Sequence, residues 1–91
     1  MGIFAYILIL ILYEFYLVEY IDDSAFLIAF GKNLRKHRKL KGFTQAQLAI
    51  DLRFDISQIS RIERGIINTS IGNINAIANI LKVDIKVLFD F

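Results

Sequence analysis

The feature that most restricts the fold is a series of helix signals that continues from residue 25 to residue 91. Apolar residues recur there at helical spacing, as in Phe26, Phe30 and Leu34, and no strand pattern competes. Gly42 and Gly65 follow two of these apolar segments at positions typical of helix ends. Neither a repeat nor a proline-rich or serine-rich linker interrupts the range. The sequence therefore predicts an all-α fold.

Short polar residues mark the predicted helix starts. Residues 22–24 (Asp-Asp-Ser) can accept hydrogen bonds from the free N–H groups of a first helix that starts near Ala25 and ends near Leu40. Thr44, with Gln47 three residues later, matches a capping box for a second helix over residues 45–52. The remaining predicted starts are Asp55, for a helix to about residue 63, Ser70, and Asp84.

Charge divides the chain into two parts. Residues 1–29 contain four acidic residues and no Lys or Arg, whereas residues 30–91 contain all 11 Lys and Arg residues and five acids. A basic domain favours a polyanionic partner such as nucleic acid. The capping residues at 22–24 mark the boundary, so we assign residues 1–24 to an apolar N-terminal extension and residues 25–91 to a basic domain.

The N-terminal extension allows three interpretations. Residues 3–13 are uncharged and mostly aliphatic or aromatic, and the apolar character continues to residue 21, interrupted by Glu14 and Glu19. The segment could pack on its own domain or on a sister chain, anchor the protein in a membrane, or precede a true start near Ala25. Because glutamates are costly inside a bilayer, a membrane is not the favoured partner, and packing or dimerisation is preferred.

The composition leaves almost no candidates for catalysis. The chain has no Cys, its one histidine is His37, and it has no glycine-rich phosphate loop. These absences argue against a metal site, a nucleophilic relay and a nucleotide cofactor. We expect a protein that is not an enzyme and has neither a cofactor nor a metal. A chain without cysteine also suits the reducing cytoplasm, where we expect it to act.

Two motifs carry a specific resemblance. The segment GFTQAQLA at residues 42–49, followed by ISRIERG at residues 59–65, resembles the lambda-repressor/Cro-type helix-turn-helix family, often called Xre-like. The resemblance runs without a gap from about Phe30 to Phe89. It implies a five-helix, lambda-repressor-like DNA-binding domain in which residues 45–52 cross the DNA backbone and residues 55–63 enter the major groove.

The same resemblance implies a function. The chain would be a sequence-specific transcriptional regulator that binds double-stranded DNA, as a homodimer on a roughly palindromic operator. An alternative from another class is a protein-interaction or membrane-tethered module on the same scaffold, because a fold alone does not establish a function.

The resemblance also assigns roles to individual residues. The base-contacting positions are Ile56, Ser57, Gln58 and Arg61. Arg61 would pair with guanine, Ser57 would bond to several bases, and Ile56 would touch a thymine methyl group. The alternative for Ile56 is packing in the core.

Other positions would hold the DNA backbone or the protein itself. The phosphate-contacting positions are Gln45, Asn68, Thr69 and Ser70. Arg38 and Glu63 match an internal ion pair that clamps the first helix to the third. The chain departs from the family at Arg53, which replaces a turn glycine, at Thr69, which replaces a proline, and at residues 66–67, which replace basic residues.

Overall fold

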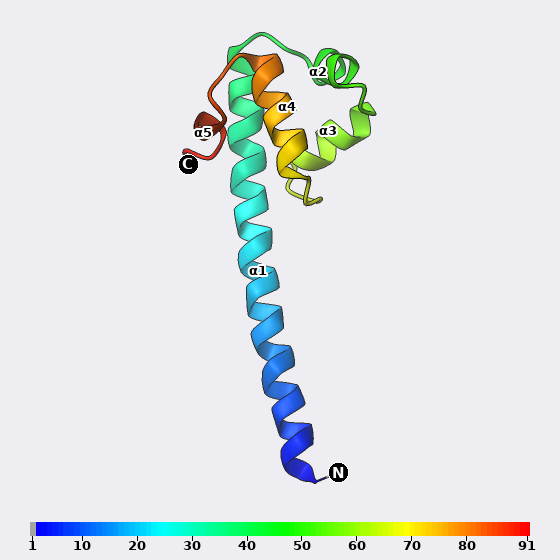
Figure 1. The fold of residues 1–91 in the computed structure, drawn as a ribbon, viewed down its shortest axis with the longest axis vertical. Helices are drawn as coiled ribbons and strands as arrows, with labels where there is room; N and C mark the ends of the chain where they lie inside the picture. The colour runs from blue at the N-terminus through cyan, green and yellow to red at the C-terminus, as the bar shows by residue number, and fades with distance from the viewer. Residues whose placement is uncertain (1) are drawn as a thin grey trace.

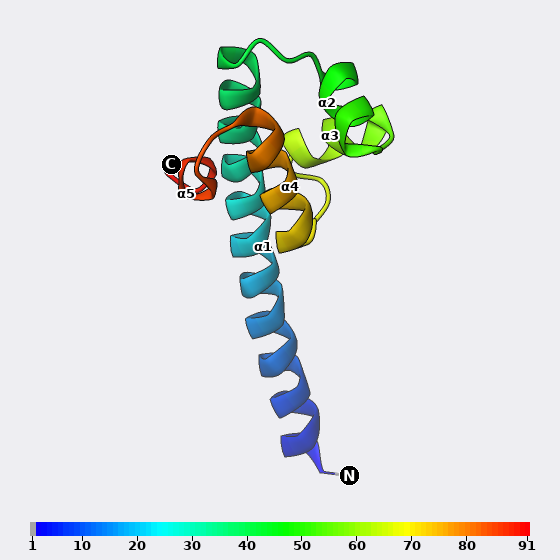
Figure 2. The ribbon, with the colours of Figure 1, turned by 45° about the horizontal axis from the view of Figure 1, so that its top comes forward.

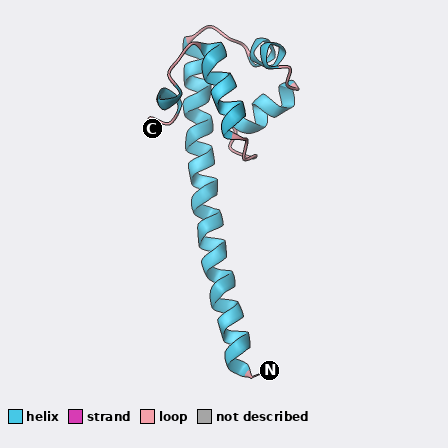
Figure 3. Cartoon of the chain, in the orientation of Figure 1, coloured by secondary structure: helices cyan, strands magenta, loops and turns pink. Residues whose placement is uncertain are grey.

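The computed structural model describes the backbone of residues 2–91 and the side chains of residues 2–13 and 23–91. Five helices follow one another: α1 (Ile3–Leu40), α2 (Gln45–Leu52), α3 (Ile56–Glu63), α4 (Ile71–Leu81) and α5 (Ile85–Leu88). Residues 2–91 contain no strand (Figure 3). The prediction of an all-α, five-helix fold is therefore confirmed.

The first helix differs most from the expectation. The polar residues at 22–24 predict a helix start near Ala25, but α1 begins at Ile3, with Gly2 as its N-cap, and continues through them. Residues 3–21 contain no glycine or proline to stop a helix. Asp and Ser in a helix interior each cost less than about 1 kcal/mol, whereas starting a new helix requires a costly nucleus. The continuous helix is therefore the cheaper conformation.

The molecule consists of a helical bundle at one end of a long rod (Figure 1). Its principal extents are 60 × 25 × 19 Å. Helices α2 to α5 lie beside the C-terminal part of α1, with α5 on the side opposite α2 to α4 in Figure 1, and the N-terminal part of α1 projects away from them in both views (Figure 2). Where side chains are described, in residues 2–13 and 23–91, no helix is both long and apolar enough to cross a membrane.

Residues 3–13, in the projecting part of α1, carry mostly exposed apolar side chains. Ten large hydrophobic residues between Ile3 and Tyr13 are 44–83% exposed. Packing of the extension on its own domain, one of the outcomes expected from the sequence, is therefore wrong for residues 2–13. A helix that is apolar on all sides is usually buried, so this surface lacks a partner in the single chain.

The core lies between α1, α2, α3 and α4, with Leu88 from α5. Leu34, Leu48, Ile59 and Ile77 are each fully buried. Two residues that follow the apolar period are instead exposed: Phe26, whose ring lies 5.5 Å from that of Phe91, and Ile71, which begins α4. The helical period of apolar residues identifies which face of a helix points to the core. It does not show which turns of that face are covered by a neighbouring helix.

Three of the five predicted helix starts carry the expected side-chain cap, whereas the start predicted at residues 22–24 lies inside α1 and Asp55 does not cap α3 with its side chain. Thr44 and Gln47 form the full capping box at α2. Ser70 accepts a hydrogen bond from Asn73 N at α4, and Asp84 accepts one from Lys86 N at α5. The side-chain cap predicted for Asp55 is wrong, because Gln58 N donates to the backbone carbonyl of Asp55 at 2.9 Å instead.

Candidate nucleic-acid interface

A tight turn sets α3 against α2. Arg53 ends α2 in the left-handed conformation, with φ of 57°, and Phe54 N donates to Ala49 O at 2.9 Å. A left-handed conformation at a residue other than glycine costs about 1–2 kcal/mol, which explains why a glycine would suit this position. Beyond the turn, Ile59 and Ile62 of α3 are buried against the core. The turn and these two residues hold α3 at the surface.

The outward face of α3 carries the residues assigned to base contacts. Ser57 and Arg61 are exposed, Gln58 is half-buried, and Ile56 is 52% exposed. Core packing is therefore excluded for Ile56. Since helix α3 keeps its apolar face inward and turns a mostly polar face to solvent, it can present donors, acceptors and one aliphatic group to a DNA groove.

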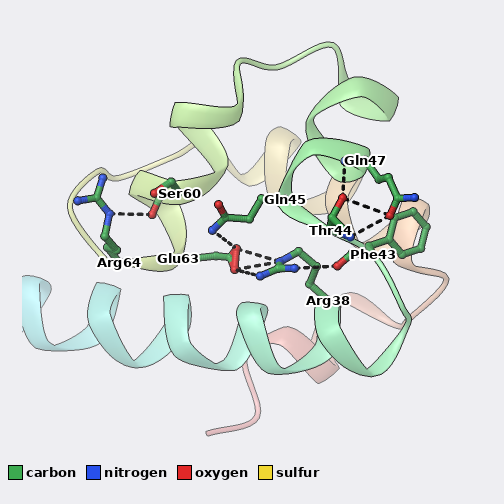
Figure 4. Close-up of polar contacts among 8 residues, drawn as sticks. All are labelled: Arg38, Phe43, Thr44, Gln45, Gln47, Ser60, Glu63 and Arg64. Atoms are coloured by element: carbon green, nitrogen blue, oxygen red, sulfur yellow. Dashed lines mark hydrogen bonds and ion pairs between the residues drawn. The ribbon is translucent and has the colours of Figure 1, made fainter.

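The C-terminal end of α3 is held by an ion pair with α1 (Figure 4). Arg38 Nη2 lies 2.9 Å from Glu63 Oε1, and Arg38 Nε donates to both carboxylate oxygens of Glu63 at 3.0 and 3.1 Å. Arg38 Nη1 donates to Phe43 O at 2.7 Å. Both charged side chains are buried, so the geometry and the hydrogen bonds compensate for lost hydration.

Gln45 joins this ion pair from the first turn of α2. Its Nε2 donates to Glu63 Oε2 at 3.3 Å (Figure 4). The sequence places Gln45 at a phosphate without indicating this contact, because residues 45 and 63 meet only through the packing of α2 on α3.

These features agree with comparisons to known proteins. A helix-turn-helix family matches residues 34–88, which is more than half of the chain. The chain belongs to the helix-turn-helix family. The resemblance seen in the residues is thereby confirmed.

Two relatives are similar to this helix-turn-helix chain. The HTH-type transcriptional regulator SlrR of Bacillus subtilis (strain 168) is 36% identical over 61 residues, which are 66% of this chain and 40% of that protein. The chain therefore spans less than half the length of SlrR. The crystal structure of the restriction-modification controller protein C.AhdI from Aeromonas hydrophila has a TM-score of 0.69 and 38% sequence identity, covering 71% of this chain and 98% of that one.

The loop that precedes α4 in this helix-turn-helix domain holds three of the assigned phosphate contacts. Asn68 is exposed, whereas Thr69 Oγ1 accepts a hydrogen bond from Asn73 Nδ2 at 2.9 Å and Ser70 caps α4. The hydroxyl groups of Thr69 and Ser70 thus already shape the loop. Gln45 contacts Glu63, the last residue of α3, and the loop begins just after this residue. The residues assigned to base contacts lie within α3 itself.

The sequence analysis did not identify two residues of α1 that set how α3 and α5 pack on it. A Cβ atom on Gly31 would collide with the backbone carbonyl groups of Ile62 and Glu63, so α1 contacts the end of α3 directly. Asn33 is buried and donates to the carbonyl oxygens of Val87 and Leu88 at 2.9 and 2.8 Å. The available signal was a glycine inside a helix, which costs about 1 kcal/mol relative to alanine and often marks a close contact.

Proposed function

We propose that this helix-turn-helix chain is a sequence-specific DNA-binding transcription regulator that reads the major groove with α3. The observation that carries the proposal is the outward face of α3, with Ser57, Arg61 and Ile56 exposed on a helix held from inside by Arg38 and Glu63. SlrR is named a transcriptional regulator and C.AhdI a restriction-modification controller, which supports this role. The role requires neither a cofactor nor an enzymatic step.

Contacts to the DNA backbone would come from around α3. Gln45 and residues 68–70 are offered for phosphate contacts, which position a protein on DNA without reading its sequence. Exposed basic side chains would add a sequence-independent attraction to the DNA phosphates. These residues are Lys32, Arg35, Lys36, Lys39, Lys41 and Arg64.

We also propose that the regulator acts as a homodimer on a roughly palindromic site in the cytoplasm. The eight residues of α3 contact few base pairs, so a second copy would extend the site, with half-sites about 34 Å apart in related geometries. The exposed apolar part of α1, Ile3 to Tyr13, supports self-association, because large apolar patches on a single chain usually mark interfaces. A two-fold dimer would bury the same patch from both chains.

Replacing Arg61 tests the reading of bases by α3. We expect Arg61→Ala to relax base preference at one operator position, at a cost of about 1–3 kcal/mol there, because a bidentate pair to guanine would be lost. Selection of binding sites from random duplexes, repeated for the wild type and the variant, measures this effect.

A matched control for Arg61 is Arg35→Ala, which removes the same charge from the exposed surface of α1. We expect the control to leave the selected consensus unchanged. An unchanged consensus for Arg61→Ala would remove this residue from the base-reading set. Wild-type protein without affinity for DNA, or without a steep dependence on salt, would instead favour an interaction module.

Deleting residues 2–13 tests the proposed dimer. We expect the full chain to sediment as a dimer without detergent, and the deletion variant to dissociate at the same concentration, because the deleted residues carry the exposed apolar surface. Binding to a single half-site should survive, since α3 lies in the bundle. Equal masses for the two proteins would contradict this interface, and recovery of the full chain only in membranes would favour an anchor.

A further inference from the structure

We propose that Glu63 is a positioning residue for DNA binding, which holds the side-chain amide of Gln45 ready for a phosphate. This inference rests on the proposed function. This role differs from the clamp between α1 and α3, for which the Arg38–Glu63 pair alone would suffice. The additional contact of Glu63 with Gln45 connects the pair to α2 (Figure 4).

The carboxylate of Glu63 is itself rigidly held. Its side chain is 2% exposed, and three contacts of 2.9 to 3.1 Å join it to Nε and Nη2 of Arg38. Arg38 is fixed in turn by its bond to Phe43 O in the loop between α1 and α2. A carboxylate has acceptor sites beyond those that one arginine fills, and Gln45 Nε2 uses Oε2. Glu63 therefore offers Gln45 an acceptor oxygen whose position is set by the contacts with Arg38.

The contact decides how Gln45 presents its amide. The last side-chain torsion of glutamine is broad, so a free amide would sample many orientations. With one N–H directed to Glu63, the nitrogen end of the amide faces the pair and a second N–H is left for a phosphate oxygen. Such preorganisation increases affinity because less freedom is lost on binding.

The charge balance permits a phosphate near this site. A carboxylate next to a DNA backbone would normally repel the phosphates. Here the positive charge of Arg38, whose Nη2 lies 2.9 Å from Glu63 Oε1, balances the negative charge of Glu63. The same contacts connect the first turn of α2 to the last residue of α3. A phosphate held by Gln45 would therefore sit at a defined place relative to the recognition helix.

Replacing Gln45 in two backgrounds tests the proposal. In the wild type, we expect Gln45→Ala to weaken binding about fivefold on specific and random duplexes alike, the effect of one ordinary hydrogen bond to a phosphate. The second background carries Arg38→Met and Glu63→Leu together, which removes the acceptor without leaving a buried charge. There we expect Gln45→Ala to change affinity less than about twofold, in keeping with the lost preorganisation.

Controls separate this inference from the proposed function. Asn79→Ala, on the exposed side of α4, should have the same small effect in both backgrounds. Equal losses for Gln45→Ala in both backgrounds, or no loss in the wild type, would overturn the role of Glu63 while wild-type DNA binding remained. Absence of wild-type DNA binding would reject the proposed function itself.

A measurement on the unaltered protein covers the case in which the double replacement does not fold. The side-chain amide protons of Gln45 should exchange with solvent more slowly than those of Gln47, whose Oε1 accepts at the helix cap and whose side chain is exposed. Equal exchange of the two amides by NMR would show that Gln45 is not held in solution and would overturn the proposal.

Discussion

Glu63→Ala is expected to lower the free energy of unfolding by about 3–5 kcal/mol, because it leaves the charge of Arg38 buried without a partner. Both residues are at most 6% exposed, and Arg38 Nη2 lies 2.9 Å from Glu63 Oε1. The loss is a large part of the stability of a small domain, which is typically about 5–15 kcal/mol. Denaturant unfolding followed by circular dichroism measures it.

The control for this prediction is the joint replacement of Arg38 by Met and Glu63 by Leu. Since it removes both charges and retains most of the volume, it should recover much of the stability lost in Glu63→Ala. A loss below about 1 kcal/mol in Glu63→Ala would show that the pair behaves like an exposed one.

Gly65→Ala is the other change with a large expected effect, a loss of about 3 kcal/mol or more in the free energy of unfolding. Gly65 has φ of 72°, and a Cβ atom there would lie 2.6 Å from both Cα and N of Ile28. The backbone of α1 cannot give way as a flexible side chain could. Thermal or urea unfolding of the variant measures the loss.

Gly42→Ala provides a matched control for Gly65. Gly42 has φ of 80°, but a Cβ atom there would meet nothing within 4 Å. We expect only the cost of the left-handed conformation, about 1–2 kcal/mol. The difference between the two variants isolates the contact with α1, and equal losses would show that this contact contributes nothing.

The sequence predicted the bundle well where the signals are local. The bounds of α2, the capping box of Thr44 and Gln47, and the caps at Ser70 and Asp84 all agree with the structure. A cap and the helix it starts lie within a few residues of each other, so short-range chemistry decides them. The exceptions are Asp55, whose side chain does not cap α3, and the start of α1, where helix continuity prevailed over the caps predicted at residues 22–24.

The candidate site shows the same division. The family pattern and helical period together placed Ser57 and Arg61 on an outward face, and the structure has both exposed. Neither pattern indicates that Gln45 Nε2 donates to Glu63 or that Gly31 contacts the end of α3. Residues 45 and 63, which are 18 positions apart, meet only once the helices have packed.

The sequence by itself thus determined an all-α chain, the bounds of α2, the starts of α3 to α5 to within a residue, and membership of the helix-turn-helix family. Only the tertiary structure decided that α1 begins at Ile3 with an exposed apolar surface between Ile3 and Tyr13, and that Gln45 joins the ion pair of Arg38 and Glu63. The physical reason is range. Caps and periodicity act over one or two turns, whereas burial and a shared carboxylate depend on how separate helices pack.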